Sequence, residues 1–125
     1  MRRLSFLLAV VLFAAACHVA GPSTNVTETF TGTVAPVSNS TFNFDVKGSG
    51  EFWIKIVSLN PAATVGIGFG VRTSSGCGMV QFNDFATAGA TALTNSIVQG
   101  AYCAGIYDSG QMTTTVSYTI TVNHP

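Results

Sequence analysis

The chain has 125 residues, enough for one domain with one hydrophobic core. Only 8% of its residues are charged, far below the usual quarter or so, and the surface must therefore consist of Thr, Ser, Asn and Gly instead of ion pairs. The formal net charge is zero, and without Arg2 and Arg3 the chain is slightly acidic. This balance excludes a nucleic-acid-binding protein, because phosphate binding requires clustered basic side chains.

The N-terminal segment has the form of a secretory signal peptide. Met1-Arg2-Arg3 is a positively charged start, and residues 4–16 form a nearly unbroken apolar run that ends in small residues. This run is shorter than the roughly 20 apolar residues that a transmembrane helix needs. We therefore expect residues 1–16 to be a helical export signal.

The residues before Cys17 resemble the lipobox of bacterial lipoproteins, in which small residues precede a cysteine that is lipidated and becomes the new N-terminus. The match departs at Ala14, where that family usually has Leu, so plain cleavage and release of a soluble protein is the alternative. The resemblance implies lipidation of Cys17 and anchoring to the bacterial membrane, on the periplasmic side or at the cell surface, since two or more acyl chains anchor stably. Residues 17–26 would then be a tether.

The three cysteines predict one disulfide. An odd number of cysteines in an exported protein leaves one to explain. If Cys17 carries lipid, Cys77 and Cys103 remain as a pair, which an oxidising compartment allows to close. Closing this loop would contribute roughly 3 kcal/mol. Two buried free thiols are the alternative, and no metal site is expected because neither cysteine has a Cys or His at ligand spacing.

Residues 27–123 read as a single β-domain. Period-two alternation and turn signals recur about every ten residues, and no segment has a helical period. The predicted strands are 27–34, 41–47, 52–59, 64–72, 79–82, 95–99, 102–106 and 116–122, with a loop at 83–92. Apolar residues on both faces mark 52–59 as a central strand. Short strands at this spacing predict an all-β, antiparallel β-sandwich of jelly-roll-like form with about eight strands.

Two alternating runs near the C-terminus flank a turn signal, Asp108-Ser109-Gly110. The pattern predicts two antiparallel strands that share one buried side. The Asp108 side chain is expected to accept a hydrogen bond from the backbone two residues further on.

Glycine alternates with bulky residues in the segment 65–71, so one strand face is bare backbone. Glycine within a strand often marks the close approach of other atoms. Those atoms belong either to a neighbouring aromatic side chain, for which Trp53 is the candidate, or to a ligand.

Four short motifs resemble the bacterial pre-peptidase C-terminal domain, a jelly-roll-like β-sandwich. They are Phe42-x-Phe44-x-Val46, Gly50 before the strand from Phe52, Gly100-x-Tyr102-x-Ala104-x-Ile106, and Tyr118-x-Ile120-x-Val122. The resemblance covers roughly residues 27–122 and implies a non-catalytic domain of the kind attached to secreted peptidases, with relatives implicated in binding matrix proteins or polysaccharides. Some relatives bind calcium, but Ala62-Ala63-Thr64 stands where that family often has an acidic pair, so no metal is expected.

The sequence predicts no catalytic site and no cofactor. His18 and His124 fall in expected tails, where a general base cannot be held in position. Trp53 and Tyr107 lie opposite the predicted core faces and are candidate ligand contacts, because exposed aromatic rings stack on sugars. Packing under a loop is the alternative for both.

Together these patterns predict a non-catalytic exported lipoprotein, acting as a binding or structural module at the bacterial cell envelope. The expected partners are the membrane, through the lipid on Cys17, and a polysaccharide or an envelope protein. The alternative is a carbohydrate- or matrix-protein-binding accessory domain.

Overall fold

The structure is a computed structural model that describes residues 24–125. The predicted signal peptide, the predicted lipidation site Cys17 and most of the predicted tether lie outside the described residues. The described chain forms eight strands: β1 (Val26–Val34), β2 (Asn39–Val46), β3 (Gly50–Asn60), β4 (Val65–Thr73), β5 (Gly76–Ala86), β6 (Thr91–Ile97), β7 (Gly100–Tyr107) and β8 (Val116–His124). The predicted all-β class is confirmed.

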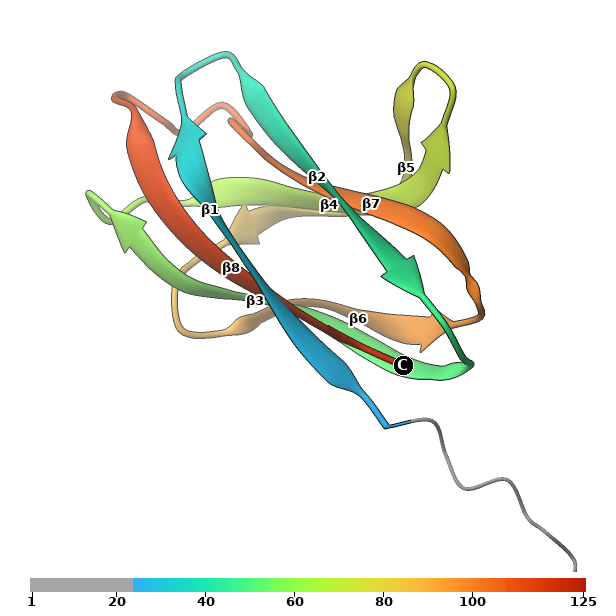
Figure 1. Cartoon of the computed structure of the whole chain (residues 1–125). Coiled ribbons are helices and arrows are strands. Elements are labelled where there is room, and N and C mark those ends of the chain that lie inside the picture. The colour runs from blue at the N-terminus through green and yellow to red at the C-terminus, as the bar shows by residue number, and fades with distance from the viewer. Residues whose placement is uncertain (1–23) are drawn as a thin grey trace, which may run out of the picture.

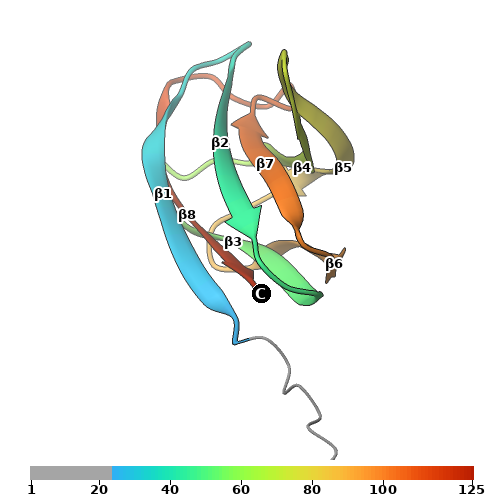
Figure 2. The same cartoon turned by 45° about the vertical axis from the view of Figure 1, so that its right-hand side comes forward.

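The eight strands build two four-stranded antiparallel sheets packed face to face as a sandwich (Figures 1 and 2). Sheet 1 has the strand order β1-β8-β3-β6, and sheet 2 has the order β2-β7-β4-β5. β3 lies between β8 and β6, so its prediction as a central strand is confirmed.

Alternation places the apolar side chains of both sheets in one core. In β8 the residues Val116, Tyr118, Ile120 and Val122 are buried, while the residues between them are partly or fully exposed. Rings from the two sheets meet in the core, with the centroids of Phe52 and Phe69 4.4 Å apart. Burying a side chain of this size contributes about 1.5–3 kcal/mol.

The two open edges of the sandwich are closed in different ways. Phe30 of β1 stacks on Phe42 of β2 with the ring centroids 4.3 Å apart. At the other edge, the Gln81 and Asn83 amides of β5 donate hydrogen bonds to backbone carbonyls of β6, at 3.3 and 2.9 Å. These side-chain hydrogen bonds link β5 to β6 although the two strands belong to different sheets.

The predicted turn at Asp108 implied that the two C-terminal strands pair with each other. This prediction is wrong. β7 belongs to sheet 2 and β8 to sheet 1, so the segment between them crosses from one layer to the other. Alternation correctly identified the buried side of each strand. It carries no information about which sheet a strand joins, because both sheets face the same core.

The predicted bounds of β5 and β6 were wrong, since residues 83–86 continue β5 and β6 begins at Thr91. The register of β4 and β5 shifts twice, and the extra residues on β5 include Val80 and Phe85. A bulge inserts a residue without a partner and breaks the alternation on which the prediction depended. Val80 and Phe85 are exposed as a result.

His124 does not lie in a frayed tail. It is the last residue of β8 and only 2% exposed, because its ring packs beside Phe44. Its Nε2 atom lies 2.8 Å from Oε2 of Glu28 on β1, and its Nδ1 atom lies 3.0 Å from the Pro125 carbonyl oxygen. Polar partners at both ring nitrogens explain how a histidine can end a buried strand.

Candidate binding groove

An open groove of about 1060 Å³ lies on the outer face of sheet 2, away from sheet 1. Its walls come from the turn between β1 and β2, from the β4–β5 hairpin, and from the end of β7. The side chains that define it are Val37, Thr41, Met79, Phe82, Asp84 and Tyr107. We call this feature the sheet 2 groove.

The side chains of Tyr107 and Met79 line the groove, and they lie over glycines at the places where a Cβ atom would be. A Cβ atom added to Gly66 would overlap the ring of Tyr107, and one added to Gly68 or Gly105 would overlap the thioether end of Met79. The expectation that an aromatic ring covers the glycine face is therefore confirmed for Gly66. The ring is that of Tyr107 and not of Trp53, which belongs to the other sheet.

Gly70 is required for a different reason. A Cβ atom there would overlap backbone atoms of Gly78 and Met79, because the β4–β5 hairpin bends closely over this position. Figure 1 shows the hairpin turning up and out of sheet 2. The bend raises one wall of the groove.

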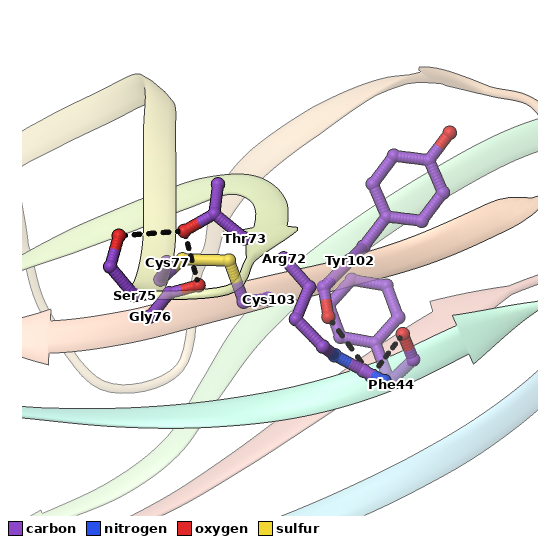
Figure 3. Close-up of a disulfide and its surroundings, with 8 residues drawn as sticks. All are labelled: Phe44, Arg72, Thr73, Ser75, Gly76, Cys77, Tyr102 and Cys103. Carbon is purple, nitrogen blue, oxygen red and sulfur yellow. Dashed lines mark hydrogen bonds between the residues drawn. A yellow bond between two sulfur atoms is a disulfide. The ribbon is translucent and has the colours of Figure 1, made fainter.

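The disulfide between Cys77 and Cys103 holds this hairpin in place, so the predicted pairing is confirmed (Figure 3). Cys77 lies on β5 and Cys103 on β7, the two neighbours of β4, and strands on either side of a third are normally about 9–10 Å apart. The two Cα atoms are only 5.7 Å apart, which shows how far β5 leans over β4. Arg72, near the hairpin tip, adds hydrogen bonds to the carbonyls of Phe44 and Tyr102 at 3.3 and 3.4 Å.

Tyr107, Asp84 and Phe82 form an aromatic corner with a carboxylate beside it. The Tyr107 hydroxyl donates a hydrogen bond to Oδ1 of Asp84, and Phe82 meets the Tyr107 ring edge to face at 6.2 Å between centroids. Partial burial raises the pKa of Tyr107 far above its ordinary value of 10, and the hydrogen bond to Asp84 and its charge raise it further. The phenol therefore stays neutral, while Phe82 leaves 56% of its surface exposed.

Asp108 fixes the opposite rim of the groove. Its Oδ2 atom accepts a hydrogen bond from the Val37 backbone at 2.9 Å, and its Oδ1 atom accepts from Gly110 and Met112 at 2.8 and 3.1 Å. The predicted hydrogen bond two residues along the chain is thus confirmed. These backbone donors, Val37 first, lower the pKa of Asp108, so its carboxylate remains charged.

Val37, at this rim, has a strained backbone. Its φ angle is +56°, a left-handed conformation that is costly for a β-branched residue, and its side chain is 96% exposed. Residues held in such conformations concentrate at ligand-binding and other functional sites. The strained backbone holds the Val37 side chain fully exposed at this rim of the groove.

The groove carries negative charge. Asp84 and Asp108 line it, and within residues 24–125 no Lys, Arg or His does so. Arg72 pairs with Asp45 at 3.3 Å, outside the groove lining, and Lys55 lies on β3 in the other sheet. The charges of the two carboxylates therefore disfavour an anionic ligand here.

The structure does not bring the two candidate aromatic contacts together. Trp53 points outward from sheet 1, between Thr94 and Asn123 on the neighbouring strands, whereas Tyr107 lies on the outer face of sheet 2. Phe82 and Met79 were not predicted from the sequence as groove residues. The glycine stripe of β4, which consists of Gly66, Gly68 and Gly70, was the signal that could have revealed them. Bare backbone requires side chains from neighbouring strands to cover it.

Neither a cluster of metal-binding side chains nor a membrane-spanning helix is found in residues 24–125. There, no three His, Cys, Asp or Glu side chains gather as a metal site would require. In the same stretch, no helix is long and apolar enough to cross a membrane.

No known protein family matches the chain, and a search of curated proteins finds no relative. The structure supports an eight-stranded antiparallel sandwich of two sheets, with no family identified.

Proposed function

We propose that this protein is a non-catalytic, exported bacterial lipoprotein. Its single β-sandwich acts as a binding module at the cell envelope, and the sheet 2 groove is the surface that makes contact. A lipid on Cys17 holds the module at the membrane.

The disulfide supports export. Disulfides form and persist in oxidising compartments and are rare in the cytosol. The Cys77–Cys103 bond, together with the signal-like residues 1–16, is consistent with a protein that works outside the cytoplasm.

The groove is the observation that carries the binding role. Its volume is at the upper end of the range for ligand sites, and apolar and aromatic side chains with a few convergent polar groups are the usual composition of such a site. Phe82 and Val37 are displayed at its rim although neither contributes to the core. Contiguous apolar patches that are rimmed by polar residues are typical of interaction surfaces.

The hydrogen-bond partners of His124 and Asp108 support the proposal that the protein is not catalytic. A nucleophile needs a base with a free nitrogen or oxygen in reach. Both ring nitrogens of His124 already have partners in Glu28 and Pro125, and the Asp108 carboxylate is occupied by backbone donors. These arrangements hold the fold together.

A carbohydrate- or matrix-protein-binding accessory domain is the second candidate. The resemblance of residues 27–122 to the pre-peptidase C-terminal domain favours it, as does an aromatic corner beside Asp84 on which a sugar ring could stack.

The anchor can be tested by mass spectrometry of the membrane fraction from a bacterial export host. A mature chain that begins at an acylated Cys17 is expected, and Cys17→Ser should release the protein into the soluble fraction. A wild-type chain without acyl groups would contradict the lipoprotein proposal.

The binding surface can be tested by co-sedimentation with isolated envelope material, using aromatic substitutions on the two outer faces. Phe82→Ala removes a groove side chain, whereas Trp53→Ala makes a similar change on sheet 1. Loss of co-sedimentation for Phe82→Ala alone is expected. Equal binding by both variants and the wild type would contradict a role for the groove.

A further inference from the structure

We infer that the sheet 2 groove recognises a lysine side chain displayed by a partner protein. This inference rests on the proposed binding function and names the chemistry of the partner.

Charge is the first argument. Both ionised groups that line the groove are carboxylates, Asp84 and Asp108, and the lowered pKa of Asp108 keeps it charged. The carboxylates accept hydrogen bonds and have none to donate. The one hydroxyl hydrogen of the aromatic corner, on Tyr107, is already donated to Asp84. Hydroxyl and amide side chains that line the groove can also donate hydrogen bonds, so the charges of the two carboxylates are what favours a cationic ligand group.

The second argument is that the Asp84 carboxylate can accept further hydrogen bonds. The hydrogen bond from Tyr107 uses Oδ1, and an ionised carboxylate offers about four lone-pair sites. Because the raised pKa keeps Tyr107 neutral, the residue orients the carboxylate without cancelling its charge. Asp84 is exposed, so an incoming ammonium group can reach it.

The apolar walls are the third argument, and they favour a cation that is carried on an apolar stem. Met79 and the exposed Phe82 ring border the carboxylate, and Phe82 meets Tyr107 edge to face. A lysine side chain has an apolar four-carbon stem and a charged end, so the stem can lie along these walls while the ammonium reaches Asp84. A cation near aromatic faces is further attracted by the ring quadrupole.

The test is a titration of the full-length, disulfide-bonded protein, followed by amide NMR shifts. The probe is a Gly-Lys-Gly peptide with both ends capped, and the control is the same peptide with its lysine acetylated, which removes the charge. Shifts at Phe82, Asp84 and Tyr107 are expected with the lysine peptide. Acetylation should weaken binding about tenfold, by losing both the ion pair and the cation–π contact.

Two isosteric substitutions sharpen the test. Asp84→Asn keeps an acceptor for the Tyr107 hydroxyl but removes the charge, and should weaken binding about two- to fivefold. Glu51→Gln makes the same charge change on β3 of the other sheet and should leave binding unchanged.

Four outcomes would overturn the inference. Equal binding of the acetylated peptide, or equal loss in Asp84→Asn and Glu51→Gln, would show that a specific ammonium contact is not involved. If a neutral oligosaccharide or Ca²⁺ shifted the groove amides while the lysine peptide did not, the lysine assignment would fail and the binding groove would stand. The envelope co-sedimentation of Phe82→Ala tests the groove itself, so the two failures are distinguishable.

Discussion

Gly70 is the position in the glycine stripe where one added methyl group should lower the free energy of unfolding most. A Cβ atom at Gly70 meets the carbonyl group of Gly78 and the Cα atom of Met79, which are backbone atoms that a disulfide holds in place. A Cβ atom at Gly68 meets mainly the sulfur of Met79, at the end of a flexible side chain that can rotate away.

The two substitutions form a matched pair. Replacing Gly by Ala reduces the entropy of the unfolded chain by a similar amount at both sites, about 0.4–1 kcal/mol, so this contribution cancels in the comparison. Overpacking a core typically costs about 1–3 kcal/mol. Gly70→Ala should reach the upper end of that range, about 3 kcal/mol, because backbone must move. Gly68→Ala should cost about 1 kcal/mol or less.

Urea unfolding measures the difference, with the fluorescence of Trp53 or far-ultraviolet circular dichroism as the signal. The free energy of unfolding of Gly70→Ala should lie at least about 1.5 kcal/mol below that of Gly68→Ala, at similar urea dependence. If the two variants were equally stable within about 0.5 kcal/mol, the close crossing of the β4–β5 hairpin over Gly70 would be refuted.

Three further predictions concern the hairpin and the groove rim. Replacing both Cys77 and Cys103 by Ser should lower the free energy of unfolding by roughly 3 kcal/mol, because it frees a loop spanning a 26-residue separation, and should lower Tm by about 12 °C or more; a calorimetric change below about 3 °C would contradict this. The lowered pKa of Asp108 means that its ionised form stabilises the fold above the ordinary value of 3.8 and that this contribution disappears as pH falls through the lower folded-state pKa. The urea midpoint of the wild type should thus fall more steeply below about pH 4 than that of Asp108→Asn, and parallel curves would argue against the role of Asp108. Val37→Asn should raise the free energy of unfolding by about 1 kcal/mol, since Asn tolerates the left-handed conformation, and a chemical-denaturation midpoint at or below that of the wild type would refute the assigned strain.

Alternation in the sequence located the strands that have one clean buried face. β1 and β8 were predicted almost to their ends because each keeps period two along its length. β4 was predicted equally well because bulky residues alternate with glycine in its sequence, although both of its faces are buried. β5 could not be delimited, since its bulges at Val80 and Phe85 interrupt the period. Pairing was also beyond the sequence, because β7 and β8 are adjacent along the chain but lie in different layers.

The candidate site could be predicted only in part, for a similar reason. Tyr107 was identified from its position opposite the core face, and the glycine stripe indicated that something lies close to β4. Which side chains cover that stripe depends on the strand order. β7 and β5 lie beside β4, whereas Trp53 lies on β3 in the other sheet. His124 was misjudged because Phe44, on which its ring packs, and Glu28, its hydrogen-bond partner 96 residues away, are both distant in the chain.

The central claim is that this sandwich meets its partner through the outer face of sheet 2. The most direct test is a map of amide line broadening in the isotope-labelled protein when isolated envelope material is added. The account predicts broadening at Phe82, Asp84 and Tyr107 while the outer face of sheet 1 around Trp53 stays sharp. Broadening centred on Trp53, with an unchanged groove, would contradict it.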